Sequence, residues 1–531
     1  MTEILESTTA PTRAPRGIST AGDRILARVR RLHNSSSGDA TVVGVFGFLI
    51  AFAFSWVPSI WYDESATIVS ATRTWAQLWR EIHTVDAVHA TYYFSMHVWF
   101  SIVGYSPIAL RLPSAVAVGI AGALVVMLAT ALTSKRTGLV AGLVFILLPR
   151  VTWAGGEGRS YATATALATA LTLVFVHASQ RRPDDRARFM RWWALYGFLA
   201  LASTAVFLYS ALLVVAHGIT LLLWARRSRR DRRVTPVTSA FVGWAASAAI
   251  AGVTLMPLAR LSLAESGQVS WIPRPNPLTI YGFFVTQWFT NNIPFAVFGW
   301  GLIVAAVILV VRKGARHVMP NVLQVTLPWI LVPALGLIAA SFVTSPLYSP
   351  RYVTFGAPAV AILMAVALTS IRRRALIAGG VVLSLLLSAP TWVAQREPEA
   401  KDMSSWKKVA ALVEHERKLE GAGANDAVIY GTLRRHPTGS ARSMMYSYPG
   451  AFSGTTDVTI DRTAADAGTL WETRYPLDEV VDRVEGHEYV WLITSDKNDE
   501  RPEVTGELAG KGYHVDEEWH FSYVNVVRYE R

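Results

Sequence analysis

Most of the chain alternates between long apolar segments and short polar clusters that are mainly basic. A helix needs about 20 predominantly apolar residues to cross a membrane. Eleven segments between Thr41 and Ala394 approach or reach that length, so we predict eleven membrane-spanning helices. They cover residues 41–60, 108–132, 137–155, 160–179, 192–209, 210–225, 238–258, 293–311, 322–343, 352–370 and 374–394.

The basic clusters indicate how these spans are oriented. They follow the polar N-terminal tail and recur at 135–136, 181–191, 226–233, 312–316 and 372–374. Since Lys and Arg are enriched in cytoplasmic loops, each interval between clusters should hold an even number of spans. This parity predicts a multi-pass protein of the plasma (inner) membrane, with the N-terminus cytoplasmic and the C-terminal domain extracytoplasmic.

Two intervals between the basic clusters are unusual. Residues 192–225 are tight for two spans, which predicts short helices or a locally thinned membrane. Residues 61–134 must hold an odd number of spans, and 108–132 is one of them. Tyr92–Gly104 is apolar and aromatic but too short to cross. We interpret it as a helix on the outer membrane surface, within a first outer loop of residues 61–107.

The two ends of the chain differ from this pattern. Residues 1–40 are rich in Thr, Pro, Ser and Arg, which predicts a disordered cytoplasmic tail. From Gln395 charges become frequent and apolar runs shorten to strand length. Strands are expected at 427–430, 489–494 and 522–529, and amphipathic helices at 401–419 and 502–511. The fold class is therefore a polytopic α-helical transmembrane domain, residues 41–394, followed by an extracytoplasmic α/β domain, residues 395–531.

Composition supports this class and excludes several others. Hydrophobic residues make up 52% and charged residues 17%, whereas a soluble globular chain is about 25% charged. The net charge of +12 resides in short clusters between apolar segments, so no nucleic-acid partner is predicted. The chain contains no Cys, which excludes disulfides, zinc–thiolate sites and a cysteine nucleophile.

Two adjacent carboxylates follow the first span, in Trp61-Tyr-Asp63-Glu64-Ser65. One explanation is structural, because acids at the start of a helix interact favourably with its dipole. The other is a catalytic carboxylate at the outer membrane boundary. Charged residues gathered at the ends of apolar spans on one side of a membrane are candidates for a functional site.

Further polar motifs lie on the same outer side by the parity argument. The long loop after the seventh span carries Trp271-Ile-Pro-Arg274, for which an aromatic belt and a carrier-binding loop are both open interpretations. The other motifs are His89-Ala-Thr-Tyr92-Tyr93, Ala109-Leu-Arg111-Leu-Pro-Ser-Ala115, Gly158-Arg159-Ser-Tyr161-Ala162 with Glu157 before it, and Ser349-Pro-Arg351-Tyr352 with Tyr348 before it.

In order and spacing, these motifs resemble the membrane-embedded GT-C glycosyltransferases over residues 41–370. The most similar group is the protein O-mannosyltransferase-like one (glycosyltransferase family 39), which includes the lipid A aminoarabinose transferase. The resemblance implies an inverting enzyme. It would move a hexose, mannose by this resemblance, from a polyprenyl-phosphate carrier to an acceptor hydroxyl at the outer leaflet. The implied partners are that lipid-linked sugar and a glycan, lipid or protein acceptor.

The resemblance also implies residue roles. Asp63 matches the general base and Glu64 its neighbour. Glu157 and Arg159 match groups around the lipid phosphate, and Arg351 with Tyr352 matches an Arg-Tyr pair that binds it. Carrier or substrate contacts are also expected at His89, Tyr92, Arg111, Tyr161, Arg274 and Tyr348. One departure weakens the role of His89, because many relatives have His-Pro-Pro where this chain has His89-Ala-Thr.

The chemistry of such a transfer suits these residue types. Displacement at the anomeric carbon needs one carboxylate to deprotonate the incoming hydroxyl. It also needs cationic donors for the departing phosphate, and the forked guanidinium of Arg suits that anion better than Lys does.

Two other functions fit the same sequence. One is a transporter or flippase for a lipid-linked sugar, although such proteins usually show similar halves and mid-membrane charges. The other is a non-catalytic cell-envelope assembly subunit. No cofactor is predicted. A divalent metal at His83, Asp86 and His89 is possible, but their spacing matches no compact ligand pattern.

Overall fold

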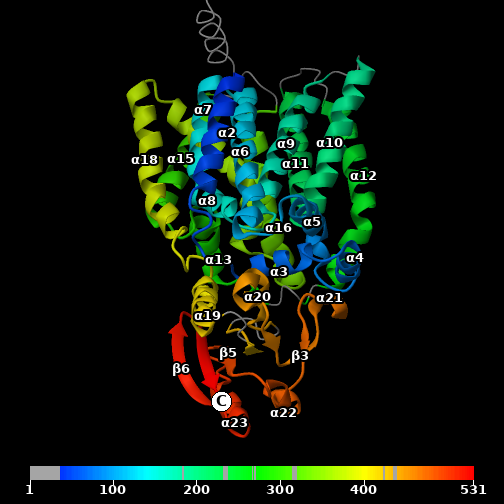
Figure 1. Cartoon of the computed structure of the whole chain (residues 1–531). Coiled ribbons are helices and arrows are strands. Elements are labelled where there is room, and N and C mark those ends of the chain that lie inside the picture. Colours follow the sequence, from blue (N-terminus) through cyan, green and yellow to red (C-terminus); the bar gives the residue numbers. More distant parts are fainter. Residues whose placement is uncertain are drawn as a thin grey trace, which may run out of the picture.

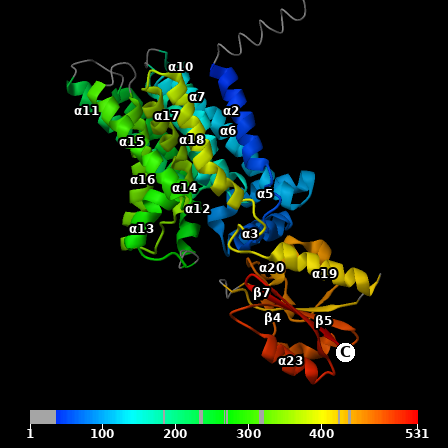
Figure 2. The ribbon, with the colours of Figure 1, turned by 90° about the vertical axis from the view of Figure 1, so that its left-hand side faces the viewer.

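The computed structural model describes residues 36–181, 185–230, 237–265, 267, 271–313, 320–421, 425–434 and 439–531. They form a bundle of long helices with an α/β domain attached to one end (Figure 1). The same two parts are evident when the molecule is turned by 90° (Figure 2). The predicted fold class, a polytopic α-helical protein with a C-terminal α/β domain, is confirmed. The predicted tail of residues 1–40 lies almost entirely outside the described residues.

Eight helical segments in the described ranges are long and apolar enough to cross a membrane. A ninth is added if α7 (Lys135–Leu147) and α8 (Pro149–Gly155), which bend by 64° at Leu148, make one broken span. The eight are α6 (Pro107–Leu132), α9 (Tyr161–Ser179), α11 (Ala211–Arg230) with η2 (Leu208–Ser210) before it, α12 (Val237–Ala264), α15 (Ile293–Lys313), α16 (Val322–Val343), α17 (Ala357–Thr369) with η5 (Pro350–Gly356) before it, and α18 (Arg374–Ala394).

Each predicted span overlaps a helix, but the first one, 41–60, is too long, because α2 ends at Phe52 and residues 53–58 form turns and bends. The count of eleven stays a prediction. Helices α2 (Ser36–Phe52) and α10 (Arg186–Val206) fall outside the length and hydropathy criteria that the other spans meet. The expectation of short helices at 192–225 is wrong, because α10 has 21 residues and α11 has 20. Helix α10 begins earlier than predicted since the Asp185 side chain accepts a hydrogen bond from the Arg188 amide and caps its N-terminus.

Small residues let the first two helices of the bundle pack closely. A side chain at Gly119 of α6 would place its first carbon 2.7 Å from the carbonyl oxygen of Gly44 on α2. One at Gly47 would meet Ile146 at 2.9 Å. Since lipid tails are as apolar as the helix surfaces, close packing of this kind is what holds such helices together. The pair α2 and α6 therefore anchors the loop that joins them.

That loop, the first outer loop, is folded. It contains α3 (Tyr62–Ala71), α4 (Trp75–Ile82), η1 (Ala87–His89) and α5 (Ala90–Val103). Helix α5 is the short helix predicted at 92–104. Trp79 of α4 and Ile102 of α5 expose 59% and 74% of their surface, as expected for helices that face the membrane interface. A second outer segment, after α12, contains α13 (Pro277–Tyr281), the π-turn η4 (Gly282–Thr286) and α14 (Gln287–Phe289).

The C-terminal domain is built on a five-stranded mixed sheet of order β2-β1-β5-β7-β6. Strand β1 is parallel to β2 and β5, whereas β7 is antiparallel to β5 and β6. The strands are β1 (Ala427–Tyr430), β2 (Thr456–Asp457), β5 (Tyr489–Ser495), β6 (His514–Phe521) and β7 (Val524–Glu530), and β3 (Ile460–Arg462) pairs separately with β4 (Thr473–Arg474). The three strands predicted from the sequence are confirmed.

Helices cover both faces of this sheet. The chain enters through α19, whose Trp406 and Val409 pack on one face with Trp491, and α23 contributes Val504 and Leu508 to the other. The predicted helix at 401–419 begins only at Trp406, because residues 401–405 turn back toward the first outer loop. The helices are α19 (Trp406–Glu420), α20 (Arg442–Ser447), η6 (Pro449–Phe452), α21 (Ala464–Ala467), α22 (Leu477–Val480), η7 (Val481–Val484) and α23 (Arg501–Ala509).

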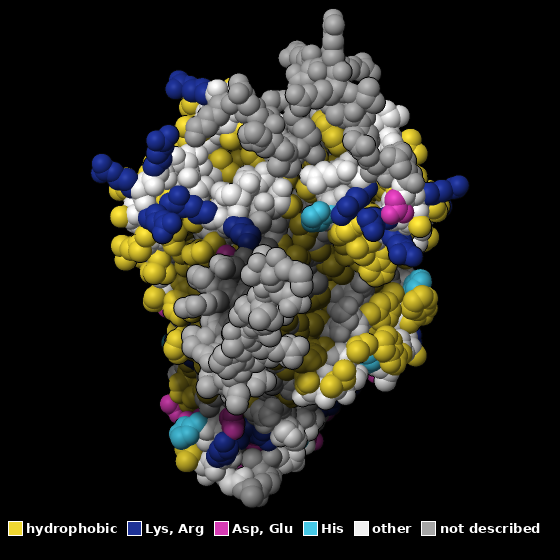
Figure 3. Space-filling view, turned by 90° about the horizontal axis from the view of Figure 1, so that it is seen from above, with side chains coloured by type: hydrophobic (Ala, Val, Ile, Leu, Met, Phe, Trp, Pro, Cys, Tyr) yellow, Lys and Arg dark blue, Asp and Glu magenta, His cyan; other side chains and the backbone are white. Residues whose placement is uncertain are grey.

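Basic side chains gather at the end of the bundle opposite this domain. A view onto that end shows Lys and Arg around its margin (Figure 3). Arg136 in the first turn of α7, Arg191 in α10 and Arg372 between α17 and α18 are exposed. Parts of the basic clusters at 181–191, 226–233 and 312–316 lie outside the described residues. The described members show that the basic turns share one end, as the parity argument requires.

Candidate active site

The site is centred on α3, at the junction of the helical bundle and the C-terminal domain (Figures 1 and 2). Trp61, in extended conformation, precedes the helix, and Asp63 and Glu64 occupy its first turn. Acids at this position interact favourably with the helix dipole. Because successive residues on a helix point about 100° apart, the two carboxylates enter different surroundings.

Asp63 lies at the accessible side. Its carboxylate pairs with the Arg351 guanidinium at 2.9 Å, and each side chain retains 18% exposure. Arg351 comes from the first turn of η5, so a residue nearly 300 positions away in sequence completes the pair. The Arg351 guanidinium also lies 5.6 Å from the ring centre of Trp61 and 4.9 Å from that of Trp271, an arrangement that attracts a cation to the ring faces.

Arg159 lies on the other side of Asp63. It donates hydrogen bonds to the Asp63 carbonyl oxygen at 3.1 Å and to the Tyr93 hydroxyl oxygen at 3.2 Å. Its second terminal nitrogen lies 2.7 Å from His89 Nε2. Burial lowers the pKa of Arg159. The nearby Tyr93, Asp63 and Asp86 together raise it by more than burial lowers it, so the net pKa lies well above the ordinary value. Arg159 is therefore a permanent cation beside Asp63.

His89 is neutral in this setting. Burial, then the neighbouring Arg159, lowers the pKa of its imidazole to about 4, although Asp86 lies 3.9 Å away. An unprotonated Nε2 accepts the Arg159 hydrogen bond. Tyr93 in turn donates to Asp86, so the residues around η1 hold Arg159 in place.

Glu64, next to Asp63, is sealed, by which we mean fully buried with its carboxylate oxygens paired. Arg111 of α6 donates to both of its carboxylate oxygens, at 2.8 and 2.5 Å, and the Gly158 amide donates at 2.7 Å. Both side chains have no exposed surface. Burial raises the pKa of Glu64, but Arg111 and Lys401 outweigh burial, and the net pKa lies below the ordinary value.

The remaining Arg111 contacts go to the backbone. Its guanidinium also donates to the carbonyl oxygens of Ser55, Pro58 and Ser59, at 2.7–3.0 Å. Arg111 therefore ties the end of the first helix to α3. This geometry favours a structural role for the Glu64–Arg111 pair.

Glu157 is a second buried carboxylate in this network. Lys401 donates to one of its oxygens and the Trp61 indole to the other, the latter at 2.6 Å. Lys401 Nζ also lies 3.8 Å from Glu64. Burial raises the pKa of Glu157, Lys401 lowers it and Glu64 raises it again, and the net shift is upward. Lys401 is thus shared between two carboxylates and joins the C-terminal domain to the site.

Aromatic residues form the membrane side of the site. The rings of Tyr161 and Tyr352 stack with centres 6.5 Å apart, and Tyr209 lies 5.4 Å from Tyr352. Tyr348 donates to the Gln287 side chain at 2.7 Å, and burial raises its pKa above the ordinary value. Arg150 donates to the carbonyl oxygens of Thr286 and Gln287.

The structure brings together most of the residues that the sequence singles out. Asp63, His89, Arg159 and Arg351 form one connected group. Tyr92 and Arg111 are buried beneath it. Arg274 is exposed, and no described contact joins it to Asp63 or Arg351.

Sequence reasoning missed Lys401 and Trp61 as site residues. Trp61 was adjacent to the Asp63 motif and could have been included on that ground. Lys401 follows the last span by seven residues and carries no local signal. No cluster of three or more metal-binding side chains occurs within the described ranges.

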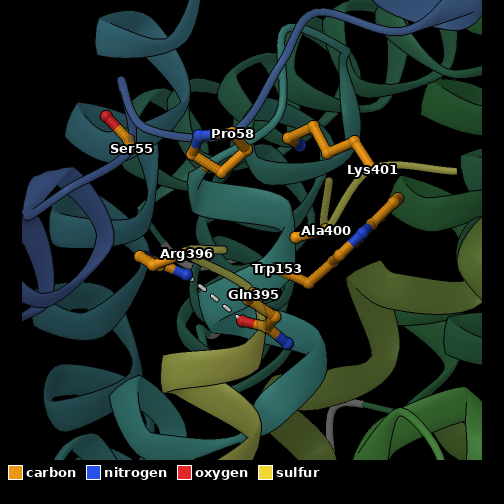
Figure 4. Close-up of a pocket in the computed structure, with 8 residues that line it drawn as sticks. Ser55, Pro58, Trp153, Gln395, Arg396, Ala400 and Lys401 are labelled. Atoms are coloured by element: carbon orange, nitrogen blue, oxygen red, sulfur yellow. Dashed lines mark hydrogen bonds between the residues drawn. The ribbon is translucent and has the colours of Figure 1, made fainter. Parts of the chain in front are cut away.

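A small hollow behind the site has a structural lining. It is bordered by Trp153, Gln395, Arg396 and Lys401 (Figure 4). Arg396 donates to the carbonyl oxygens of Ile50, Ala51 and Ala53, at the end of α2. Burial lowers its pKa to about 10. Its donors are thus occupied in holding the chain ends of α2 and α18 together.

Comparisons with known proteins identify the fold. The chain is similar to the crystal structure of ArnT from Cupriavidus metallidurans in the apo state, with a TM-score of 0.58 and 12% identity over 92% of this chain and 97% of that one. It is also similar to ArnT from the same organism bound to undecaprenyl phosphate, with a TM-score of 0.54 and 13% identity over 93% and 98%. No family model and no curated protein matches the sequence. The chain has the fold of this GT-C glycosyltransferase, as the sequence motifs predict.

Proposed function

We propose that the protein is an inverting glycosyltransferase that takes a sugar from a polyprenyl-phosphate carrier. The observation that carries this proposal is the Asp63–Arg351 pair, a partly accessible carboxylate held by one guanidinium, with a second guanidinium, that of Arg159, on the Asp63 carbonyl oxygen. The shared fold with ArnT, one structure of which is bound to undecaprenyl phosphate, supports the choice of carrier. Mannose is the sugar we propose, from the sequence resemblance alone.

Asp63 acts as the general base. The acceptor hydroxyl loses its proton to the Asp63 carboxylate while its oxygen forms a bond to the anomeric carbon of the sugar. The bond between that carbon and the phosphate oxygen breaks, and polyprenyl phosphate departs as an anion. A single displacement inverts the anomeric configuration, and one carboxylate is enough because the leaving group needs no protonation.

Arg351 and Arg159 hold the phosphate. Guanidinium groups bind phosphate oxygens in a forked geometry, and such charge-assisted bonds are stronger than neutral ones. Arg351 Nε is buried and lacks a hydrogen-bond acceptor among the described residues, so it has a donor left for a phosphate oxygen. Tyr161, Tyr209 and Tyr352 line the membrane side, where the carrier tail would lie.

We also propose the orientation. The basic turns lie at one end of the bundle and the C-terminal domain at the other (Figure 3). By the enrichment of Lys and Arg in cytoplasmic loops, the site and the C-terminal domain face the outside of the plasma membrane. A membrane-impermeant maleimide should label Glu503→Cys in intact cells and leave Arg136→Cys unlabelled. Both positions are exposed, and the reverse pattern would reject this orientation.

The Asp63→Asn variant tests the reaction. Purified protein in lipid nanodiscs would receive a short-chain polyprenyl-phosphate mannose and envelope extract as the acceptor source. We expect transfer to fall by about 10²–10⁴-fold, the range contributed by general bases, while carrier binding changes little. Asp478→Asn, which alters an exposed carboxylate of the C-terminal domain, is the control and should behave as wild type. A transporter or a scaffold would tolerate Asp63→Asn, so transfer above a tenth of wild type rejects the proposed base.

A further inference from the structure

A groove between the first outer loop and the C-terminal domain has no role in the reaction described above. It is a shallow groove that is open to solvent. Four stretches of chain build it: the residues before α3, the turn that leads into α19, the residues that follow β1, and the hairpin between β6 and β7. We call it the junction groove. Its principal side chains are Trp61, Tyr62, Asp402, Trp406, Arg434 and Tyr523.

The lining of the junction groove combines flat aromatic surfaces with charged groups. The Arg434 guanidinium lies 4.1 Å from the ring centre of Tyr523 and pairs with Asp496 at 2.6 Å, so this wall is held in one orientation. Asp402 contributes a carboxylate from the turn before α19. Sugars present apolar C–H faces that stack on aromatic rings and hydroxyl edges that pair with carboxylates and guanidinium groups.

The backbone of the groove is held in an uncommon conformation. Asp402, Met403 and Tyr523 have φ values of 50°, 57° and 64°, in the left-handed region that favours glycine. Three of the seven non-glycine residues with positive φ in the described ranges therefore line one groove. Such strain persists only where the surrounding structure imposes it, and it is concentrated at functional sites.

The groove is continuous with the catalytic group through Trp61. The Trp61 ring lies beneath Arg351, the partner of Asp63, and its indole nitrogen is fixed by Glu157. Trp61 and Tyr62 directly precede Asp63 in the chain. A molecule in the groove therefore contacts the two residues that directly precede the proposed base in the chain.

We propose that the junction groove is the acceptor subsite and that it binds a saccharide. This inference rests on the proposed glycosyltransferase function and names its acceptor class. A peptide is disfavoured, because extended peptides bind along exposed strand edges, whereas the sheet reaches the groove at the turn before β7, an interior strand. The C-terminal domain thus supplies half of the acceptor site.

Binding of free sugars to the full-length protein in nanodiscs tests this. The probe is a panel of manno-, gluco- and arabino-oligosaccharides with short soluble peptides containing Ser and Thr, read by saturation-transfer NMR. We expect at least one oligosaccharide to bind the wild-type protein. Tyr523→Gly removes the aromatic ring and tolerates the positive φ at this position. It should weaken oligosaccharide binding by about tenfold, the effect of losing one aromatic contact. Tyr523→Phe, which keeps the ring, and Tyr475→Ala, an exposed Tyr outside the groove, should bind as wild type.

The outcomes separate this proposal from the reaction. Oligosaccharide binding should persist in Asp63→Asn. Rejecting Asp63 as the base would therefore leave the saccharide subsite standing, and rejecting the saccharide subsite would leave Asp63 as the proposed base. Absence of binding to wild type, or equal binding to Tyr523→Gly, would overturn the saccharide subsite. Peptide binding that depends on Tyr523, without sugar binding, would overturn it in favour of a protein acceptor.

Discussion

Asp63 and Glu64 are neighbours on one helical turn and have opposite environments. Glu64 has no exposed surface and is held by Arg111, the Gly158 amide and the more distant Lys401. Asp63 keeps 18% of its side chain exposed and pairs with Arg351 at the edge of the aromatic-lined region. A buried charge needs full pairing because its removal from water is costly, whereas a reactive carboxylate must be reachable.

This difference shows how a single motif can combine structure and chemistry. The sealed network around Glu64 fixes α3 between α6, the turn at Gly158 and the C-terminal domain. With α3 fixed, Asp63 is held at a set position relative to Arg159 and Arg351. In our interpretation Glu64 positions the helix and Asp63 performs the reaction, which gives the two residues separable phenotypes.

The largest expected effect is on stability and comes from the sealed side. Glu64→Ala leaves the Arg111 charge buried and unpaired, which should lower the free energy of unfolding by about 3–5 kcal/mol. Asp63→Asn is the control and should cost less, because the Asp63–Arg351 pair keeps contact with water and Asn retains the shape and a hydrogen-bond acceptor. Thermal unfolding of the detergent-solubilised proteins, followed by tryptophan fluorescence, measures both. Equal stability losses for the two variants would contradict the distinction between the buried, paired Glu64 and the accessible Asp63.

The second effect is a pH dependence on the open side. The His89 pKa is lowered from 6.5 to about 4 by burial and by Arg159. Between these values the unfolded chain binds more protons than the folded one, so stability is fully present above pH 6.5 and is lost as the pH falls toward 4. The loss should be at most about 3 kcal/mol, and His89→Gln should remove it.

This measurement must be a difference between His89→Gln and wild type. Burial raises the pKa of Glu81 to about 7, and its pairing with Arg73 only partly offsets this. Glu81 therefore favours the folded state at low pH and opposes the His89 effect over an overlapping range. Thermal unfolding of both proteins at pH 4.5, 5.5, 6.5 and 7.5 isolates the histidine. A constant difference across that series would show that His89 is not held neutral.

The smallest expected effect concerns carrier affinity. Arg351→Ala should weaken binding of a short-chain polyprenyl phosphate by about ten- to a hundredfold, the effect of one charge-assisted contact of about 1.5–3 kcal/mol. Arg351→Lys should restore only part of it, since Lys offers a point charge instead of a fork. Titration by isothermal calorimetry distinguishes the variants. If both bind as wild type, Arg351 serves only Asp63, and the phosphate site must be sought at Arg159.

The positions of the helices and of the central strands could be predicted from sequence. Apolar segments of membrane length mark the spans, and the basic turns place them in order. Strands β1 and β5 are continuous apolar runs, as expected for buried parallel neighbours. Residues 401–405 were predicted as helix and are not, because Lys401 reaches Glu157 and the turn follows it. That contact joins residues 244 positions apart, so it cannot be predicted from the local pattern of hydrophobic and polar residues.

Which residue types meet at one end of the bundle follows from the sequence alone, because span parity brings the loops with Asp63, Arg159 and Arg351 to one side. The sequence did not determine which of the two adjacent carboxylates is sealed. That depended on where Arg111 points and on Lys401 entering from the other domain. The junction groove likewise exists only where four distant stretches of chain meet. Hydrophobic length and charge are local properties of a chain, whereas burial and pairing arise only when its segments pack.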